Sequence, residues 1–288
     1  EKIFDNIWIQ PAAGDAGGSL GAALAYWYIE LNKGRKVSNK DEMTGSYLGP
    51  LYSDQDIQKT LKNLGANFEV LNDEKLIEKT AEDLSKGRAI GWFQGRMEFG
   101  PRALGGRSIL GDPRSETMQK NLNLKVKYRE SFRPFAPSVL REDAHNWFEL
   151  NKDSPYMLLV ADIKKDKQNK MSDEEKKLFG IDKLNIKRSE IPAVTHVDYS
   201  ARIQTVHEET NKKYYNLIKK FKEKTNCPVI VNTSFNVRGE PIVNTPDDAF
   251  NCFMGTELDN LAIGNCYLIK KNQDPSLKKN YIKNFELD

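Results

Sequence analysis

A buried strand followed by a capped helix is indicated by residues 228–248, PVIVNTSFNVRGEPIVNTPDD. The apolar run 228–231 is short and β-branched, which is typical of a strand in the interior of a sheet. The helix is expected to begin with Thr245 as its N-cap, since a proline follows directly and two aspartates occupy the first turn. A loop over residues 233–243 separates the two, so the stretch predicts strand, loop and helix in that order.

The same alternation extends to both sides of this stretch. Apolar residues at three- and four-residue spacing predict helices, and short apolar runs predict strands. The predicted helices cover residues 53–64, 73–86, 115–123, 142–150 and 210–225, and the predicted strands cover 88–93, 136–140, 156–163 and 262–270. Strands that alternate with helices favour an α/β sandwich, in which we expect some antiparallel strands.

The beginning of the chain follows a different pattern. An apolar run at 7–9 leads through PAAGDAGG into a helical pattern, which predicts strand, glycine-rich turn and helix. Residues 33–53 lack sustained periodicity and are rich in glycine, so we expect a linker there. The predicted domains are residues 1–44 and 45–288. Because the sequence does not start with Met, we expect it to be processed or cut from something longer.

The composition is that of a globular protein with a charged exterior, with 39% hydrophobic and 30% charged residues. We expect a soluble protein without membrane contact, since no apolar stretch approaches the ~20 residues of a membrane helix. Three cysteines without a CxxC pair favour a reducing, cytoplasmic environment. The net charge of +3 is too small to indicate a nucleic-acid partner by itself. The polar residues 164–190 predict a mobile surface insertion.

Arginine is concentrated in one part of the chain, where residues 96–133 hold six of the 12 arginines. The planar guanidinium grips phosphate or carboxylate at two points, so this concentration marks a candidate anion site. Residues 95–108, GRMEFGPRALGGRS, combine three arginines with four glycines whose backbone N–H groups can approach an anion. The stretch lacks the P-loop and GxGxxG signatures, so a Walker NTPase and an ordinary dinucleotide site are not expected. A solvated surface loop is the alternative.

Two further stretches carry polar groups in a pattern that suits binding. Residues 125–137, KVKYRESFRPFAP, alternate charge with bulk, which predicts either an amphipathic edge strand or a stripe that binds RNA. Residues 232–236, NTSFN, follow a predicted strand directly, where hydroxyl and amide groups suit hydrogen bonding to a polar ligand. Turn formation by Asn and Ser explains these residues equally well.

Six motifs stand in the order and spacing of one family. They are PAAGDAGG at 11–18, GPRALG at 100–105, RSILGDPR at 107–114, the run at 127–137, ARIQTV at 201–206, and NTSFN at 232–236 with GEPIV at 239–243. In these motifs the sequence closely resembles the C-terminal half of the NodU/TobZ-type O-carbamoyltransferases, over nearly the whole chain. It departs from the family pattern at Gly106 and Gly111, where Asn and Ala are commoner.

The resemblance implies one half of a two-part enzyme. Residues 45–288 would form a YrdC-like domain, a twisted mixed sheet flanked by helices, that makes carbamoyl-adenylate from carbamoyl phosphate and ATP with Mg²⁺. Residues 1–44 would be the strand-turn-helix remnant of an actin/Hsp70-like domain. In the intact protein that domain would bind Fe²⁺ or a related divalent metal and would pass the carbamoyl group to a hydroxyl of a sugar or other small molecule. The missing N-terminal domain would therefore be a partner.

The resemblance also implies roles for individual residues, because several phosphate charges must be offset in one pocket. The expected catalytic groups are Arg96, Arg107, Lys127, Arg129, Arg202 and Ser234, although some of the arginines must be structural. ATP and carbamoyl phosphate would contact Gly100, Arg102, Ala103, Leu104, Ser108, Arg133, Phe135, Gln204, Thr205, Asn232 and Asn236, with backbone donors from residues 100–104. Asp15 would ligate the divalent metal, and a helix N-cap is its alternative role.

Two other functions stay open at this point. A YrdC-like domain without catalysis could hold double-stranded RNA through phosphate contacts on a basic concave face. Alternatively, the half-protein could be an inert scaffold that binds nucleotide without turnover. The acceptor of the carbamoyl group cannot be identified from this half, because it would bind mainly in the other domain.

Overall fold

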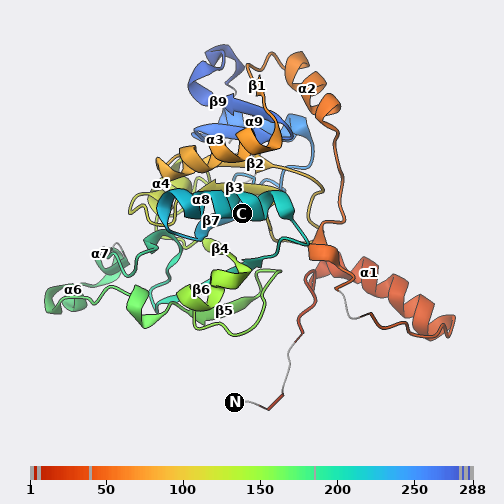
Figure 1. Ribbon diagram of the computed structural model, residues 1–288, viewed down its shortest axis with the longest axis horizontal. Coiled ribbons are helices and arrows are strands. Elements are labelled where there is room, and N and C mark those ends of the chain that lie inside the picture. The colour runs from red at the N-terminus through yellow and green to blue at the C-terminus, as the bar shows by residue number, and fades with distance from the viewer. Residues whose placement is uncertain are drawn as a thin grey trace.

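A sheet lies at the centre of the molecule. The structure, a computed structural model, describes residues 3–4, 8–38, 41–184, 186–278, 281 and 285. Within these residues nine strands form one sheet (Figure 1). In order across it they are β1 (Glu69–Val70), β9 (Cys266–Ile269), β8 (Asn260–Ile263), β2 (Ile90–Phe93), β3 (Arg107–Gly111), β7 (Val229–Ser234), β4 (Ala136–Leu140), β6 (Ser200–Val206) and β5 (Leu159–Asp162). The pairs β2/β8 and β4/β6 are parallel and the other pairs antiparallel. The mixed sheet confirms the α/β class, and its YrdC-like and actin-like details stay predictions.

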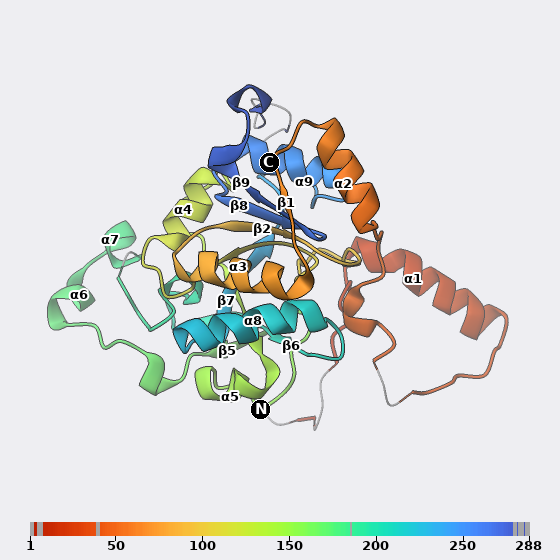
Figure 2. The same ribbon diagram turned by 45° about the horizontal axis from the view of Figure 1, so that its top comes forward.

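Helices pack on the sheet in two groups. α3 (Asp73–Ser85) and α8 (Lys212–Thr225) contact each other, and α8 also contacts β4 and β7; the two helices lie side by side in both views (Figures 1 and 2). α9 (Pro246–Gly255) contacts β2 and β8 and packs against α2 (Asp54–Asn63). The other helices are α1 (Asp15–Ala25), α4 (Met118–Lys125), α5 (Ala144–Trp147), α6 (Asp173–Lys177) and α7 (Gly180–Leu184).

Helix α9 begins as its sequence predicts. Thr245 Oγ1 accepts a hydrogen bond from the Asp248 N–H at 3.1 Å, and Asp248 Oδ2 accepts one from the Thr245 N–H at 2.9 Å. This capping box satisfies two backbone donors at a helix end, and Pro246 in the first turn has no donor to satisfy. The helix then buries one side against the sheet, which fixes the loop between β7 and α9.

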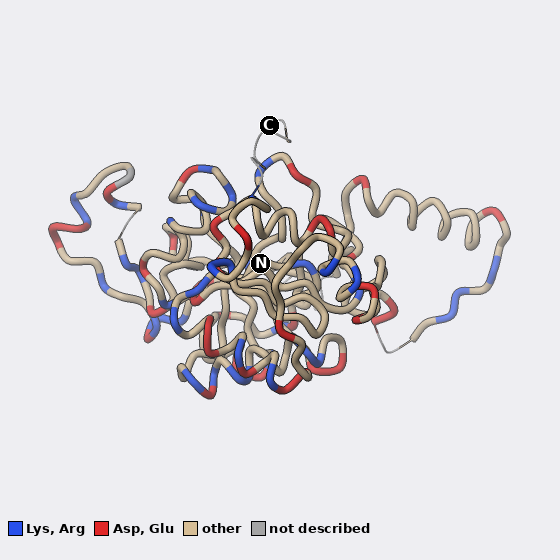
Figure 3. Tube along the Cα trace, turned by 90° about the horizontal axis from the view of Figure 1, so that it is seen from above, with Lys and Arg blue, Asp and Glu red and all other residues tan. Residues whose placement is uncertain are grey.

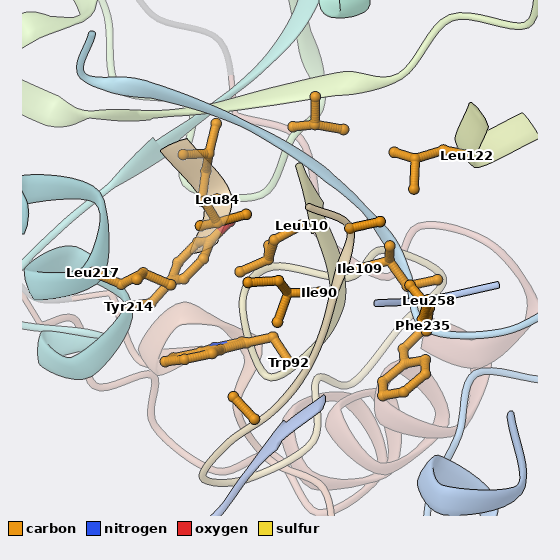
Figure 4. Packing of buried hydrophobic residues seen from close by; sticks show 14 of the residues in the cluster. Leu84, Ile90, Trp92, Ile109, Leu110, Leu122, Tyr214, Leu217, Phe235 and Leu258 are labelled. Atoms are coloured by element: carbon orange, nitrogen blue, oxygen red, sulfur yellow. The ribbon is translucent and has the colours of Figure 1, made fainter. Parts of the chain in front are cut away.

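The core fills the space between the sheet and its helices (Figure 4). Trp92 of β2 is fully buried and its indole N–H donates to the Gly105 carbonyl at 2.9 Å. Tyr214 of α8 and Phe235, which follows β7, are also fully buried. Each such side chain stabilises the fold by roughly 1.5–3 kcal/mol through removal of apolar surface from water. The core therefore holds rigid the strands that lead into the loops 95–106 and 235–241.

Several elements differ from the sequence expectation. The stretch 107–111, where no strand is predicted, is the fully buried strand β3, and the expected strand 262–270 is a hairpin of β8 and β9. The hairpin turns at Gly264, whose φ of +54° is a left-handed conformation that glycine adopts without strain. The expected helix 142–150 is shortened to α5, because Phe148 turns extended and bridges to Ile163. The predicted strand 156–163 is likewise reduced to the four residues of β5.

The N-terminal segment contacts the sheet domain at two places: the Trp8 ring packs edge to face on Tyr156, and Pro11 and Ala12 lie beside Gly100. Trp8 and Ile9 are irregular rather than a strand, and Ile7 lies outside the described residues. Pro11 and Ala12 are buried, whereas α1 has no buried residue and projects from the molecule (Figures 1 and 2). The division into residues 1–44 and 45–288 stays a prediction. No helix in the described part of the chain has the length and hydropathy to cross a bilayer.

Candidate anion-binding cleft

One edge of the sheet gathers the polar residues of four strands. β7 ends there, while β4, β6 and β3 begin there, so Asn232, Ala136 and Arg202 lie in one row across β7, β4 and β6. Side chains two residues apart on a strand share a face. Ser234 and Gln204 therefore stand on the same face as Asn232 and Arg202. The alternating pattern of the ARIQTV and NTSFN motifs places these groups together.

The inner cavity of this edge has a volume of about 170 Å³ and is positively charged. Arg102, Arg129 and Arg202 line it together with the hydroxyl residues Thr233 and Ser234. No Asp or Glu stands among its lining residues. Like charges that share a pocket repel one another, and a bound anion removes this cost. The lining therefore suits phosphate or another compact anion.

The arginines of the inner cavity are partly desolvated. Burial lowers the pKa of Arg202, and the nearby positive charge of Arg102 lowers it further. In both residues the Nε atom is buried without a hydrogen-bond partner in the described structure. A guanidinium N–H that is removed from water and left without an acceptor gains strongly from a charge-assisted hydrogen bond. Arg102 and Arg202 therefore each have an N–H donor, unsatisfied among the described residues, from which an anion could accept a hydrogen bond.

Arg129 joins the inner cavity to a second one. It lines both, its guanidinium lies 5.0 Å from the ring centre of Phe135, and its Nε donates to Asn123 Oδ1 at 2.6 Å. Burial, assisted by the charge of Arg133, lowers its pKa to about 10. The stacking and the hydrogen bond hold the guanidinium plane in place while other N–H groups can face the cavities.

The outer cavity, of about 460 Å³, contains the buried amine of the cleft. Lys127 lies just after α4, and its Nζ donates to the backbone carbonyls of Ser234 and Asn236. It also contacts Ser234 Oγ at 3.1 Å and Asn236 Oδ1 at 2.6 Å. Arg129, Arg133, Arg238 and Glu240 are the other charged residues of the lining. The amine is thus held at the junction of the two cavities, which share Ser234.

Burial lowers the pKa of Lys127 from 10.5 to about 7. Desolvation is the main cause and the charge of Arg129 acts in the same direction, while Glu240 opposes both. An amine with this pKa exchanges a proton near neutral pH. An anion that binds beside it favours the charged form.

A buried amide network supports the inner cavity from behind. Asn232 Nδ2 donates to the Ala103 carbonyl at 3.1 Å and to Gln204 Oε1 at 2.9 Å. Gln204 Nε2 donates to the Leu104 carbonyl at 2.8 Å, and Ser138 Oγ donates to Gln204 Oε1 at 2.6 Å. The network ties β7, β4 and β6 to the loop that carries Arg102. Gln204 therefore positions the loop and does not itself line either cavity.

The glycine- and arginine-rich loop is folded around its own carboxylate. Glu98 is buried, and its Oε1 accepts from the backbone N–H groups of Leu104 at 2.7 Å, Gly106 at 2.6 Å and Arg107 at 3.3 Å. The expectation that the Leu104 N–H would serve a bound anion is therefore not met, because Glu98 already occupies it. The loop instead presents Arg102 and Ala103 to the inner cavity.

Arg107 lies outside both cavities, contrary to the expected anion pocket. It is fully buried on β3, and its guanidinium lies 3.5 Å from the ring centre of Phe93. The Nη atoms donate to four backbone carbonyls, those of Gln94, Gly95, Gly106 and Pro50. Burial lowers its pKa to about 10. These contacts make Arg107 a structural residue that ties loop 95–106 to the segment before α2.

Other expected site residues also do not line either cavity. Arg96 is exposed and donates to the Gly49 carbonyl at 3.1 Å. The Ser108 hydroxyl accepts from the Gly105 N–H at 3.1 Å beneath the loop, and Thr205 Oγ1 lies 3.0 Å from His207 Nε2. Gly100 packs against Pro11 and Ala12 of the N-terminal segment, as a Cβ added there would lie 3.4 Å from the Ala12 Cβ.

Asp15 occupies the first turn of α1, after Gly14 as the N-cap. In the described part of the chain no three His, Cys, Asp or Glu residues gather in a way that could hold a metal ion. Asp15 by itself does not provide the ligand set that Fe²⁺ requires, and its metal role stays a prediction.

Sequence reasoning missed two carboxylates that organise the cleft. Glu98 stands inside the arginine-rich loop, where the basic residues dominate the sequence pattern. Glu240 lies in the GEPIV motif and lines the outer cavity. It accepts a hydrogen bond from the Val237 N–H at 2.8 Å and another from Tyr281. Its motif position could have indicated Glu240, but nothing in the sequence connects it to Tyr281.

The fold and the cleft define an α/β domain with a positively charged cleft, and comparison with known proteins identifies its family. A family model described as "Carbamoyltransferase C-terminus" matches residues 81–271. The chain therefore belongs to the carbamoyltransferase C-terminal family, of the NodU type that its motifs indicate.

Relatives extend the similarity over most of the chain. An uncharacterized protein of Synechocystis is 56% identical over 100% of this chain and 47% of its own length. The nodulation protein NolNO of Sinorhizobium fredii is 42% identical over 93% of this chain and 36% of its own. The 3'-hydroxymethylcephem-O-carbamoyltransferase of Streptomyces clavuligerus is 28% identical over 92% and 44%, respectively. The chain thus spans half or less of the length of these relatives.

Among solved structures, full-length HypF in the phosphate- and nucleotide-bound form matches with a TM-score of 0.40 and 16% identity. The match covers 65% of this chain and 21% of that one.

Proposed function

We propose that this chain makes carbamoyl-adenylate from carbamoyl phosphate and ATP, as one half-reaction of an O-carbamoyltransferase. The observation that carries the proposal is the cleft of two adjoining cavities that share Arg129 and Ser234. Lys127 and five arginines line it, namely Arg102, Arg129, Arg133, Arg202 and Arg238. Glu240 is the single carboxylate among the described lining residues. Family membership supplies the carbamoyl chemistry, and the charge of the cleft suits two phosphate-bearing substrates.

The reaction can be written in two balanced steps. Water attacks the phosphorus of carbamoyl phosphate, so that a new P–O bond forms, the P–O bond to the carbamoyl group breaks, and carbamate, phosphate and a proton are released. A carbamate oxygen then attacks the α-phosphorus of ATP, so that a new P–O bond forms, the bond to the β-phosphate breaks, and pyrophosphate departs with its electron pair. Both steps mainly require positioning and charge stabilisation rather than covalent help from the protein.

The residues of the cleft suit these requirements. Arg102 and Arg202 in the inner cavity would hold the compact phosphate of carbamoyl phosphate, and the outer cavity would hold the ATP phosphates beside Arg129 and Arg133. Lys127, at the junction, would offset the charge that moves onto the leaving group. Mg²⁺ would enter as the ATP complex, because both oxygens of Glu240 already accept hydrogen bonds from this chain.

The acceptor would be a hydroxyl of a small molecule or a saccharide. The name of the Streptomyces relative describes O-carbamoylation of a hydroxymethyl group, which supports an alcohol acceptor. The acceptor would bind together with the portion of the intact protein that corresponds to the remaining length of the relatives. That portion would also hold the divalent metal.

The proposal predicts pyrophosphate release from ATP that depends on carbamoyl phosphate, measured with a coupled phosphate assay and by mass detection of the adenylate. Arg202→Ala should lower kcat/KM by about 10²-fold or more, since it removes a buried charged donor worth roughly 3 kcal/mol. Arg141→Ala is the matched control, because Arg141 is exposed and its ion pairs within the described residues, with Asp153 and Glu209, lie at the surface.

Two results would contradict the proposal. One is the absence of pyrophosphate release and of ATP binding by calorimetry when Mg²⁺ and carbamoyl phosphate are both present. The other is tight, salt-sensitive binding of double-stranded RNA without nucleotide turnover, which would favour the RNA-binding alternative. Against that alternative, Figure 3 shows basic and acidic residues interspersed along the trace, not separated into a basic face.

A further inference from the structure

The C-terminal tail reaches back to the outer cavity through Tyr281. This residue lies ten positions beyond residue 271, where the family match ends. Its side chain is buried, and its hydroxyl donates to Glu240 Oε1. The ring of Phe285 packs on it edge to face, with 5.2 Å between ring centres. The tail therefore contacts a residue of the cleft lining.

Gly255 at the end of α9 provides the seat for this tyrosine. A Cβ added to Gly255 would come within 2.2 Å of the Tyr281 Cβ, a distance at which real atoms clash. The absent side chain thus leaves the space into which the ring fits. The Tyr281 ring thus packs with close shape complementarity against Gly255, unlike a side chain that rests loosely on the surface.

Glu240 passes the contact on to the loop 235–241. Its Oε2 accepts from the Val237 N–H at 2.8 Å, and its backbone carbonyl accepts from Asn236 Nδ2 at 2.6 Å. Asn236 Oδ1 in turn accepts from Lys127 Nζ and from Ser234 Oγ, each at 2.6 Å. A continuous chain of hydrogen bonds therefore runs from the tail to the buried amine.

The protonation states suit this arrangement. Burial raises the pKa of Tyr281, and its hydrogen bond to Glu240 raises it further, so the phenol keeps its proton. Burial also raises the pKa of Glu240. A phenol that donates to a carboxylate replaces part of the water which burial removes.

We propose that Tyr281 is a positioning residue of the cleft: the C-terminal tail clamps Glu240 and thereby fixes Asn236 and Lys127. Tyr281 lines neither cavity, so its effect on substrate would pass through Glu240. The tail beyond the matched region would then be a working part of the site.

The test uses Tyr281→Phe in the intact protein that contains this chain, because phenylalanine keeps the ring on Gly255 and removes only the hydroxyl. The first readout is hydrogen exchange of the Val237 amide, which donates to Glu240. We expect about tenfold faster exchange, the ratio that one hydrogen bond to a charged group supports. This readout needs no substrate and does not depend on the proposed function.

Tyr267→Phe is the matched control, since the Tyr267 hydroxyl donates to the buried Asp83 at 2.6 Å, away from the cleft. Tyr267→Phe should lower the free energy of unfolding. After correction for that change, the Val237 amide should exchange at the same rate as in the unaltered protein. A double-mutant cycle tests the route: in a Glu240→Gln background, Tyr281→Phe should change the exchange rate by less than about twofold. Unchanged exchange in Tyr281→Phe, or an equal effect in both backgrounds, would overturn the proposal.

A second readout, the kinetics of pyrophosphate release, rests on the proposed function. Tyr281→Phe should raise KM or lower kcat of pyrophosphate release by about three- to tenfold, and Tyr267→Phe should leave both unchanged. If the unaltered protein releases no pyrophosphate, the proposed function fails, while the exchange measurement still decides the role of Tyr281. Altered exchange with unaltered kinetics in an active protein would overturn the positioning role.

Discussion

Lys127 shows how the environment of one residue sets its chemistry. The same amine on the surface would be a fully charged solvated group, but burial lowers its pKa to about 7. Its carbonyl and amide partners are neutral, so they fix the position of the amine but do not provide a negative charge to compensate the protonated form. The cleft therefore keeps an amine whose protonation near neutral pH can respond to bound anions.

This depressed pKa predicts a pH dependence of stability. The unfolded chain keeps Lys127 protonated up to about pH 10.4, whereas the folded chain releases the proton above about pH 7. Between these values the unfolded state binds more protons, so the contribution of Lys127 to the free energy of unfolding rises with pH.

Urea unfolding of the native protein and of Lys127→Met should therefore diverge between pH 6 and pH 9. The free energy of the native protein relative to the variant should increase with pH, and subtraction removes the groups that both share. A difference that stays constant over this range would contradict the lowered pKa.

Glu98 makes a second prediction at the scale of the residue. Glu98→Gln keeps the shape of the side chain and removes the charge that strengthens three backbone hydrogen bonds. We expect a loss of about 1–3 kcal/mol in the free energy of unfolding, together with a higher KM, because the loop carries Arg102. The measurement combines chemical denaturation with the pyrophosphate assay.

The control for this variant is Glu82→Gln, since Glu82 forms an exposed ion pair with Lys86. Stability and KM should both stay at their native values there. If Glu98→Gln behaved like the control, the carboxylate would not organise the loop.

Helix α9 illustrates how a local signal in the sequence supports the site from a distance. The capping box at Thr245 fixes where the helix starts, and that start fixes the end of the loop that carries Asn236 and Glu240. The sheet strands β2 and β8 anchor the helix itself. An element with clear sequence signals thus delimits a loop that has few.

Thr245→Ala should destabilise the protein by about 1 kcal/mol, the usual cost of a lost N-cap. Thermal unfolding would show the change, and Thr245→Ser should restore it because serine offers the same acceptor. KM for carbamoyl phosphate should stay unchanged at temperatures well below unfolding. A neutral Thr245→Ala would indicate that packing alone defines the helix start.

The whole molecule shows which features a sequence can reveal. Residue type and motif position predict Arg202, Ser234 and Lys127 as site residues, and the fold brings all three to the lining of the two cavities; their catalytic roles stay predictions. Arg107 was placed in the same pocket because sequence alone cannot distinguish a solvated guanidinium from one that is buried under backbone carbonyls. Strand β3 was missed for a related reason, since its glycine- and arginine-rich surroundings are typical of a loop.

The sequence does not predict the two supporting carboxylates, because one binds backbone N–H groups and the other binds a side chain far along the chain. Glu98 serves backbone N–H groups, which every sequence possesses, and Glu240 meets a tyrosine 41 positions later. Likewise, the buried network of Asn232, Gln204 and Ser138 unites three strands that are far apart in the chain. Such contacts depend on the order of strands in the sheet, which periodicity does not encode.

The strand order also has a consequence for synthesis of the protein. The cleft is assembled from Arg102, Arg129, Arg202 and Ser234, and β7 must insert between β3 and β4, which leave the ribosome much earlier. At a synthesis rate of roughly 5–20 residues per second, Ser234 at the end of β7 follows Arg102 by about 7 to 26 seconds. Until β7 arrives, β3 and β4 each expose an unpaired edge, which makes the nascent chain prone to aggregation during that interval.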